Sequence, residues 1–306
     1  MLGSPSGLVV DLPEFTLGRV VTETSLEPVP FLLTVWIAGL YLVGVGVLRR
    51  RGDRWPVGRT VAFVPVGMGL FWFATSSGLA AYDTTLLSVH MVQHMVLSML
   101  VPLALALGAP VTLALRTLPA RPRRWLLACL HSRVARVLSF PPLAFLLYVV
   151  SPWALYFSGW YDATLAHAWL HELMHLHLVV VGTLFFWPIV GVDPVPGRVG
   201  YPFRMLLVVL TLPFHAFLGV TIMGQDTLLG GEHYEALRRL PGYGWLPDAL
   251  DDQHLAGGLL WSSGDLVGLL LFGVLFAQWV RASIKEAARE DRRLDRLEAA
   301  SRSESS

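Results

Sequence analysis

The chain has 306 residues, of which 54% are hydrophobic and 15% are charged, and its formal net charge is +1. This composition excludes an ordinary water-soluble domain, which carries about 25% charged residues. The near-neutral charge gives no reason to expect a nucleic acid as partner. The single cysteine excludes a disulfide framework and a CxxC metal clasp, because both need at least two thiols.

Apolar segments recur along the chain at about the length that a helix needs to cross a bilayer, roughly twenty residues. They predict an all-α polytopic membrane protein with seven transmembrane helices. The expected spans are 31–48, 58–79, 86–107, 141–157, 168–190, 203–223 and 255–280. The fourth span is the weakest prediction, because it is short and contains Pro152.

Arginine follows the odd-numbered spans and predicts their orientation. The segments after the first, third, fifth and seventh spans are rich in arginine, whereas 80–85 and 158–167 contain no Lys or Arg. By the positive-inside rule, the N-terminus lies outside and the C-terminus in the cytoplasm. Residues 1–30 lack the pattern of a signal peptide and are expected to be an extracytoplasmic segment. Residues 31–280 form the transmembrane domain, and 281–306 are expected to be a solvated cytoplasmic helix.

Six histidines lie at matching depths in the outer halves of these spans, and they are the most informative feature of the chain. They occur in the third, fifth, sixth and seventh spans: His90, His94, His171, His175, His215 and His254. Ionisable groups are costly inside a membrane, so each of them is a candidate functional residue if a partner can be named. A shared metal ion is the natural partner. Isolated histidines such as His131, His177 and His233 are instead expected to be packing or loop residues.

The spacing of these histidines predicts two layers of metal ligands. His90 and His94 lie one helical turn apart on one face, as do His171 and His175. At about 1.5 Å per residue, the second member of each pair and His215 come out roughly 10–12 Å deep. The expected deeper layer is therefore His94, His175 and His215. The expected upper layer is His90, His171 and His254, the last capping the group from the seventh span.

Methionines next to these histidines could supply thioether ligands. Met91 and Met95 accompany the first pair, and Met223 ends the sixth span. Imidazole and thioether together suit copper, and thioether favours Cu(I). Methionine also fills gaps in apolar cores, so these three residues are expected only as second-rank ligands. Acidic residues of the outer segments are expected either to attract cations to the site or simply to be solvated: Asp83, Asp226, Asp251 and Asp252.

Three chemistries fit this arrangement. The first is copper binding and transfer by ligand exchange along a ladder of His and Met. The second is a zinc peptidase, because residues 171–175 read HELMH, in which His171 and His175 would hold Zn²⁺ and Glu172 would be the general base. The third is a b-type haem with one axial histidine from each of two spans.

Four segments together resemble the CtaG-type family of cytochrome c oxidase assembly factors, in addition to HELMH. They are SVHMVQHMVLSMLVPLALALGAP at 88–110, FFWPIVGVDP at 185–194, FHAFLGVTIM at 214–223 and DDQHLAGGLLW at 251–261. The resemblance implies a seven-span bacterial plasma-membrane protein that is required for maturation of haem–copper oxidases and has a proposed part in copper delivery. The expected function is thus a non-enzymatic, copper-binding assembly factor. Its expected partners are a cytochrome c oxidase subunit, the lipid bilayer and an extracytoplasmic copper chaperone as donor.

Overall fold

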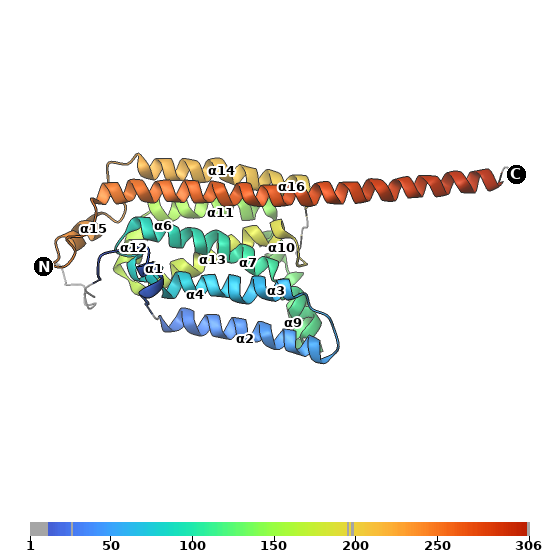
Figure 1. Ribbon diagram of the computed structural model, residues 1–306, viewed down its shortest axis with the longest axis horizontal. Coiled ribbons are helices and arrows are strands. Elements are labelled where there is room, and N and C mark those ends of the chain that lie inside the picture. Colours follow the sequence, from blue (N-terminus) through green and yellow to red (C-terminus); the bar gives the residue numbers. More distant parts are fainter. Residues whose placement is uncertain (1–11, 26, 195, 197–198, 305–306) are drawn as a thin grey trace.

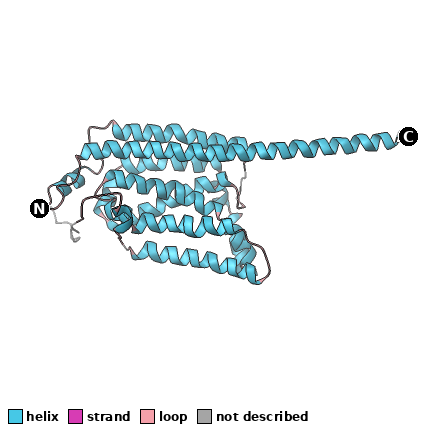
Figure 2. Cartoon of the chain, in the orientation of Figure 1, coloured by secondary structure: helices cyan, strands magenta, loops and turns pink. Residues whose placement is uncertain are grey.

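The computed structural model describes residues 12–25, 27–194, 196 and 199–304, and this part of the chain is helical apart from loops and one isolated bridge between Thr24 and Ser77. Figure 2 shows the helices as a bundle from which one long helix projects. The predicted all-α fold is confirmed. The long helices are α2 (Pro28–Arg50), α3 (Val57–Val61) with η1 (Ala62–Met68) and α4 (Gly69–Ser76), α6 (Leu87–Met95) with η2 (Val96–Leu100) and α7 (Val101–Leu107), α11 (Pro141–Phe157), α13 (Ala168–Val190), α14 (Tyr201–Met223) and α16 (Ala249–Glu304).

Short helices connect the long ones and cap the bundle at its two ends (Figure 1). They are α1 (Arg19–Thr22), α5 (Gly78–Tyr82), α8 (Pro110–Thr117), α9 (Ala120–Leu130), α10 (Arg133–Leu138), α12 (Trp160–Ala166) and α15 (Gly231–Arg238). Three hydrophobic clusters of buried side chains hold the helices together.

Six helices of the described chain are long and apolar enough to span a membrane, and a seventh span exists if α11 and α12 are counted together. These two helices are bent by 63° at their junction. The fourth predicted span is therefore the one that departs from a simple rod. Large apolar side chains such as Trp36 and Val43 on α2 and Leu266 and Leu270 on α16 are exposed, as expected for faces that meet lipid.

Two stretches of π-helix interrupt the second and third spans. The first, η1, contains Pro65, and the second, η2, ends just before Pro102. Proline has no N–H, and its ring crowds the carbonyl four residues earlier, so the helix widens at that turn. In the third span the widened turn contains Ser98 and begins two residues after His94.

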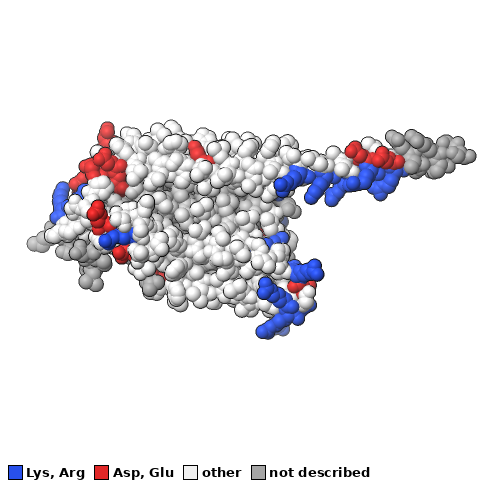
Figure 3. Space-filling model, viewed as in Figure 1, with Lys and Arg blue, Asp and Glu red and all other residues white. Residues whose placement is uncertain are grey.

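The last helix is longer than expected. The seventh span and residues 281–304 of the tail form one unbroken helix, α16, which packs along α14 and then leaves the bundle (Figure 1). Lys and Arg gather where α2 ends and α16 leaves the bundle, and most acidic residues lie at the opposite end (Figure 3). We call these the arginine end and the acidic end. The N-termini of α6 and α13, with their histidines, lie at the acidic end (Figure 1).

Candidate metal centre

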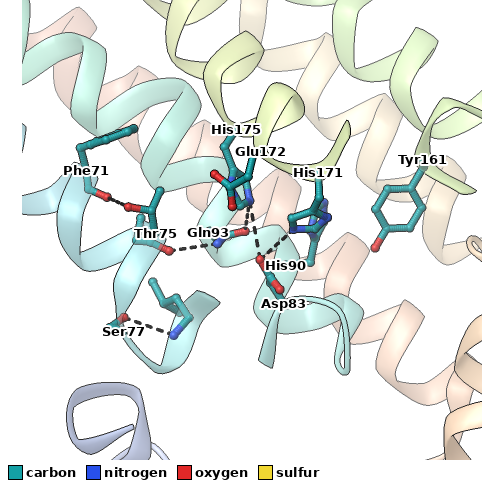
Figure 4. A network of polar contacts seen from close by, with 12 residues as sticks. Phe71, Thr75, Ser77, Asp83, His90, Gln93, Tyr161, His171, Glu172 and His175 are labelled. Atoms are coloured by element: carbon teal, nitrogen blue, oxygen red, sulfur yellow. Dashed lines mark hydrogen bonds and ion pairs between the residues drawn. The ribbon is translucent and has the colours of Figure 1, made fainter. Parts of the chain in front are cut away.

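Asp83, His171 and His175 form a buried cluster at the acidic end (Figure 4). The Nε2 atoms of His171 and His175 lie 2.9 Å and 3.6 Å from the same carboxylate oxygen, Oδ2 of Asp83. One ligand atom from each residue lies within 4.8 Å of the other two, and no other group of three His, Cys, Asp or Glu among the described residues meets this criterion. We call this cluster the carboxylate centre.

The geometry of the carboxylate centre fits a transition metal. Imidazole nitrogens and carboxylate oxygens bind such ions at about 2.0–2.2 Å, which in a tetrahedral site places neighbouring ligand atoms roughly 3.3 Å apart. The two nitrogen–oxygen separations bracket this value. The Nδ1 atoms of His171 and His175 are buried and have no hydrogen-bond partner among the described residues, so the cluster is not a saturated hydrogen-bond network.

Asp83 reaches the centre because the segment before it is tightly held. Ser77 accepts a hydrogen bond from the backbone N–H of Leu79 and so begins α5. Gly78 packs directly on the N-terminal segment, since a Cβ there would lie 2.4 Å from the carbonyl oxygen of Arg19. Tyr82 is fully buried and donates a hydrogen bond to the carbonyl of Pro13. Asp83 follows as the last residue of this short helical segment.

The charge state of Asp83 follows from its neighbours. Burial by itself raises the pKa of the carboxyl, but the adjacent His171 and His175 lower it, and the resulting pKa lies below the ordinary value. The carboxylate is therefore ionised at neutral pH. An anionic oxygen between two imidazoles is a suitable arrangement for a cation.

Gln93 fixes the orientation of one of the histidines. Its amide nitrogen donates to the carbonyl of Ala74 at 2.9 Å, which leaves the amide oxygen facing Nε2 of His175 at 3.0 Å. Gln93 is 1% exposed and comes from the same turn as His90 and His94. This oxygen lies close enough to complete the set of donors around the centre.

The first histidine pair is linked by a tyrosine from α11. The hydroxyl of Tyr156 lies 3.2 Å from Nε2 of His90 and 2.8 Å from Nδ1 of His94. All three residues are buried. The ring of His90 lies 6.1 Å from that of His171, measured between centroids, so the tyrosine-linked pair adjoins the carboxylate centre.

His94 also lines a small internal cavity together with His215 from α14. The cavity volume is about 10 Å³, and Ser98, Tyr148, Ser151 and Gly182 are among its other lining residues. The predicted deeper layer of His94, His175 and His215 is therefore divided. His175 belongs to the carboxylate centre, whereas His94 and His215 share the cavity, and the three do not form one ligand group in the described structure.

The predicted upper layer is also divided. His90 and His171 are neighbours, but His254 is exposed, because the buried face of α16 at this level carries Asp252 and Gln253. His254 therefore does not cap the histidines. Met223 is 36% exposed at the end of α14, while Met91 and Met95 pack into the largest hydrophobic cluster of the described residues. Met91 and Met95 are next to histidines in the sequence. Nothing in the described structure assigns any of the three methionines as a ligand.

Asp252 has a role other than attracting cations. It is buried, and its Oδ2 accepts hydrogen bonds from the backbone N–H groups of Leu87 at 2.7 Å and Ser88 at 3.4 Å. A carboxylate in this position satisfies the free N–H groups of the first turn of α6 and complements its dipole. Gln253, fully buried, accepts from Leu229 N at 2.8 Å. Within the DDQ motif, Asp252 thus holds the helix that carries His90 and His94, and Gln253 holds the loop after α14. Asp251 and Asp226 are exposed.

A vestibule of about 660 Å³ opens onto the carboxylate centre at the acidic end. Asp83, His171 and His175 form part of its wall, together with His233. Three further carboxylates line it, namely Glu23, Glu27 and Glu172. No Lys or Arg is among the described lining residues. The Glu172 carboxylate lies 3.9 Å from Nδ1 of His175, on the side of the ring away from Asp83.

Three residues of the site were not identified as ligands or partners in the sequence. Asp83 was expected only as a charge at the mouth, and Gln93 and Tyr156 were not singled out. Gln93 could have been identified from the sequence, because a polar side chain between two intramembrane histidines needs a partner. Asp83 and Tyr156 are brought to the site by packing of separate segments, which no local pattern in the sequence reports.

The fold and the site define a multi-pass helical membrane protein with a buried cluster of metal-ligand type. The family model for the cytochrome c oxidase caa3 assembly factor (Caa3_CtaG) matches residues 39–282. The chain belongs to this family, which confirms the resemblance drawn from the motifs.

Similar proteins occur in mycobacteria. The chain is 42% identical over 287 residues to uncharacterized proteins of Mycobacterium bovis and Mycobacterium tuberculosis, an alignment that covers 92% of this chain and 43% of each relative. An uncharacterized protein of Mycobacterium leprae is 40% identical over 262 residues, covering 83% of this chain and 39% of the relative. The chain thus spans less than half the length of these relatives. No solved structure matches it.

Proposed function

We propose that the carboxylate centre binds a copper ion and that the chain delivers this ion to cytochrome c oxidase during assembly. The observation that carries the proposal is the convergence of two imidazoles and one ionised carboxylate on a common point inside a member of an oxidase assembly family. Haem–copper oxidases need copper in order to mature, and the chain offers a site with the right donors. Delivery, rather than catalysis, is the proposed activity.

The donor set determines which ions the centre can hold. Imidazole suits Zn²⁺ and copper, and a carboxylate adds a harder, anionic donor that neutralises part of the charge of the ion. The thioethers expected from Met91, Met95 and Met223 are not needed in this proposal. Copper is preferred to zinc because the family's role is in oxidase assembly.

The vestibule supports the proposed route of the ion. Glu23 is paired with Arg19 at 3.5 Å, so the carboxylates of Glu27, Glu172 and Asp83 supply the negative potential that concentrates cations at the mouth of the centre. The arginine end of the bundle favours the cytoplasmic side by the positive-inside rule, which places the acidic end outside. We therefore propose that the protein lies in the bacterial plasma membrane, accepts copper from the extracytoplasmic side, by way of a chaperone there, and passes it to an oxidase subunit on the same side.

The other two chemistries are less well supported. A zinc peptidase would use Glu172 as general base on a metal-bound water. However, neither the family nor the relatives point to proteolysis, and the observed Glu172 contact is to the Nδ1 side of His175. A haem between His94 and His215 would need to fit into a cavity of about 10 Å³, which has no space for a macrocycle.

The test compares two neighbouring residues of HELMH. We expect His175→Ala to lose the copper of the carboxylate centre and to impair oxidase maturation, because it removes a ligand. Glu172→Gln should retain both, because Glu172 is not a ligand in this proposal. Copper is measured by elemental analysis of the purified full chain, and maturation by the copper content and activity of the oxidase in membranes.

Four outcomes would overturn the proposal. Selective retention of zinc from an equal mixture of copper and zinc would favour the peptidase, as would loss of function with full metal occupancy in Glu172→Gln. A Soret band in the protein as purified would favour haem. Wild-type protein that binds no copper would remove the basis for delivery.

A further inference from the structure

We propose a second copper site in the internal cavity, in which His94 and His215 are the ligands and Cu(I) is the ion. We call it the inner site. It rests on the proposed copper function, which concerns only the carboxylate centre, and it adds a second position for the same cargo. The inner site is built from different helices, since His94 ends the regular part of α6 and His215 lies in α14.

The cavity has polar groups in its lining, beside the apolar Pro152, Leu178 and Val181. The hydroxyls of Ser98 and Tyr148 line it, both residues are at least 95% buried, and neither hydroxyl has a hydrogen-bond partner among the described residues. Unpaired buried hydroxyls carry a desolvation cost of about 1–3 kcal/mol each. A volume of about 10 Å³ has room for one water-sized ligand. The cavity is therefore suited to a single small polar ligand.

Proline explains why a cavity exists at this depth. Pro102 and Pro152 each lie four residues after a lining residue, Ser98 and Tyr148 respectively. Because proline cannot donate to the carbonyl four residues earlier, both helices are loosened at the level of the cavity. Gly182, which also lines the cavity, allows α13 to approach closely, since a Cβ there would lie 2.1 Å from the Ser98 carbonyl oxygen. The two prolines and the glycine thus act at the level of the cavity.

The hydrogen bonds of His215 leave one ring nitrogen able to bind a metal. Nδ1 lies 3.1 Å from the carbonyl oxygen of Thr211. A carbonyl only accepts, so Nδ1 carries the hydrogen, and in the neutral ring Nε2 has the lone pair. Histidine ligands commonly donate their other N–H to a backbone carbonyl in this way, which fixes the tautomer and the ring orientation.

Tyr156 makes His94 capable of the same role and couples it to the carboxylate centre. The hydroxyl of Tyr156 has one hydrogen, so it donates to either His90 or His94 and accepts from the other. When it donates to His90, Nδ1 of His94 donates to it and Nε2 of His94 has the lone pair. When the direction reverses, the lone pair moves to Nδ1 of His90, near His171. The chain of His90, Tyr156 and His94 thus links the two sites.

Charge selects Cu(I) for the inner site. No acidic residue lines the cavity among the described residues, so a divalent ion there would keep two uncompensated charges in an apolar surrounding. Cu(I) brings one charge and is stable with as few as two imidazole ligands. The carboxylate centre can hold the same ion, and transfer between the sites then requires only exchange of ligands and no oxidation or reduction.

The test counts copper in the full chain, purified in detergent and equilibrated with Cu(I) under ascorbate. We expect two copper ions per wild-type chain, one in His215→Ala and two in the control His254→Ala, whose histidine is exposed. X-ray absorption of His171→Ala, which lacks a ligand of the carboxylate centre, should show copper bound by two imidazoles. Tyr156→Phe should weaken the second binding event by about 10-fold to 100-fold, because it removes the partner that orients His94.

The outcomes separate this inference from the proposed function. One copper per wild-type chain, unchanged in His215→Ala and absent in His171→Ala, would leave the carboxylate centre in place and overturn the inner site. No copper in the wild type would overturn both. Unchanged thermal unfolding and detergent elution of His215→Asn, together with loss of one copper, would exclude misfolding as the cause.

Discussion

The carboxylate centre and the inner site each contain two histidines, yet their surroundings differ in charge and access. The histidines of the centre both lie on α13, whereas those of the inner site come from α6 and α14. The centre adds the Asp83 carboxylate and opens into a vestibule of about 660 Å³. The inner cavity of about 10 Å³ adds only neutral hydroxyls from Ser98, Tyr148 and Ser151 and lies within the bundle. Histidine pairs alone therefore do not define a site. The anionic partner suits the centre to capture an ion from water, and the neutral enclosure suits the cavity to hold a monovalent ion apart from it.

The largest expected effect comes from removing that anionic partner. We expect Asp83→Asn to lower copper affinity at the carboxylate centre by at least about 100-fold, since it removes a ligand and the only negative charge of the cluster. Asp251→Asn is the control, because Asp251 is exposed at the same end of the bundle. Equilibrium titration with a copper indicator measures both. Equal copper affinities of Asp83→Asn and Asp251→Asn would mean that the Asp83 carboxylate does not distinguish the carboxylate centre from the inner site.

An intermediate effect is expected from pH. Between pH 7 and pH 5 we expect copper affinity at the centre to fall by roughly 10-fold to 100-fold, because protons compete with a metal ion for imidazole ligands. Asp83 does not contribute to this fall. Its pKa is lowered, so its stabilising contribution is present above its unfolded-state pKa and is lost only as the pH falls through the lower pKa of the folded state.

The pH dependence of Asp83→Asn sharpens this prediction. The variant should still lose affinity between pH 7 and pH 5, starting from its lower value, because its imidazole ligands remain. Copper binding of the wild type that is constant over this range would show that imidazoles are not the ligands.

The smallest expected effect concerns α6, which contributes Gln93 to the carboxylate centre and His94 to the inner site. We expect Asp252→Ala to lower the stability by about 1–2 kcal/mol, because it removes the cap of α6, which carries His90 and His94. Asp251→Ala should change it little. Thermal unfolding of the purified chain checks the difference. Copper stoichiometry should remain unchanged in both variants, and loss of copper in Asp252→Ala alone would indicate that Asp252 acts on the sites directly.

The sequence predicted the helices and the candidate histidines because both depend on local patterns. Apolar length identifies spans, and the four-residue spacing of His171 and His175 places them on one face of α13, where they do meet at Asp83. Depth counting grouped the histidines into layers by their position along each helix. It could not assign partners, because equal depth does not specify which faces of two helices meet.

The sequence by itself thus determined that this is a helical membrane protein of the oxidase assembly family, with costly imidazoles gathered toward one end. Tertiary structure alone decided how they are grouped. It turned His254 outward because Asp252 and Gln253 occupy the buried face of α16. It brought Asp83 to His171 from 88 residues away, and Tyr156 between His90 and His94 from another helix. Such contacts depend on the rotation and packing of whole helices, which are set by many weak interactions across the bundle rather than by any local pattern.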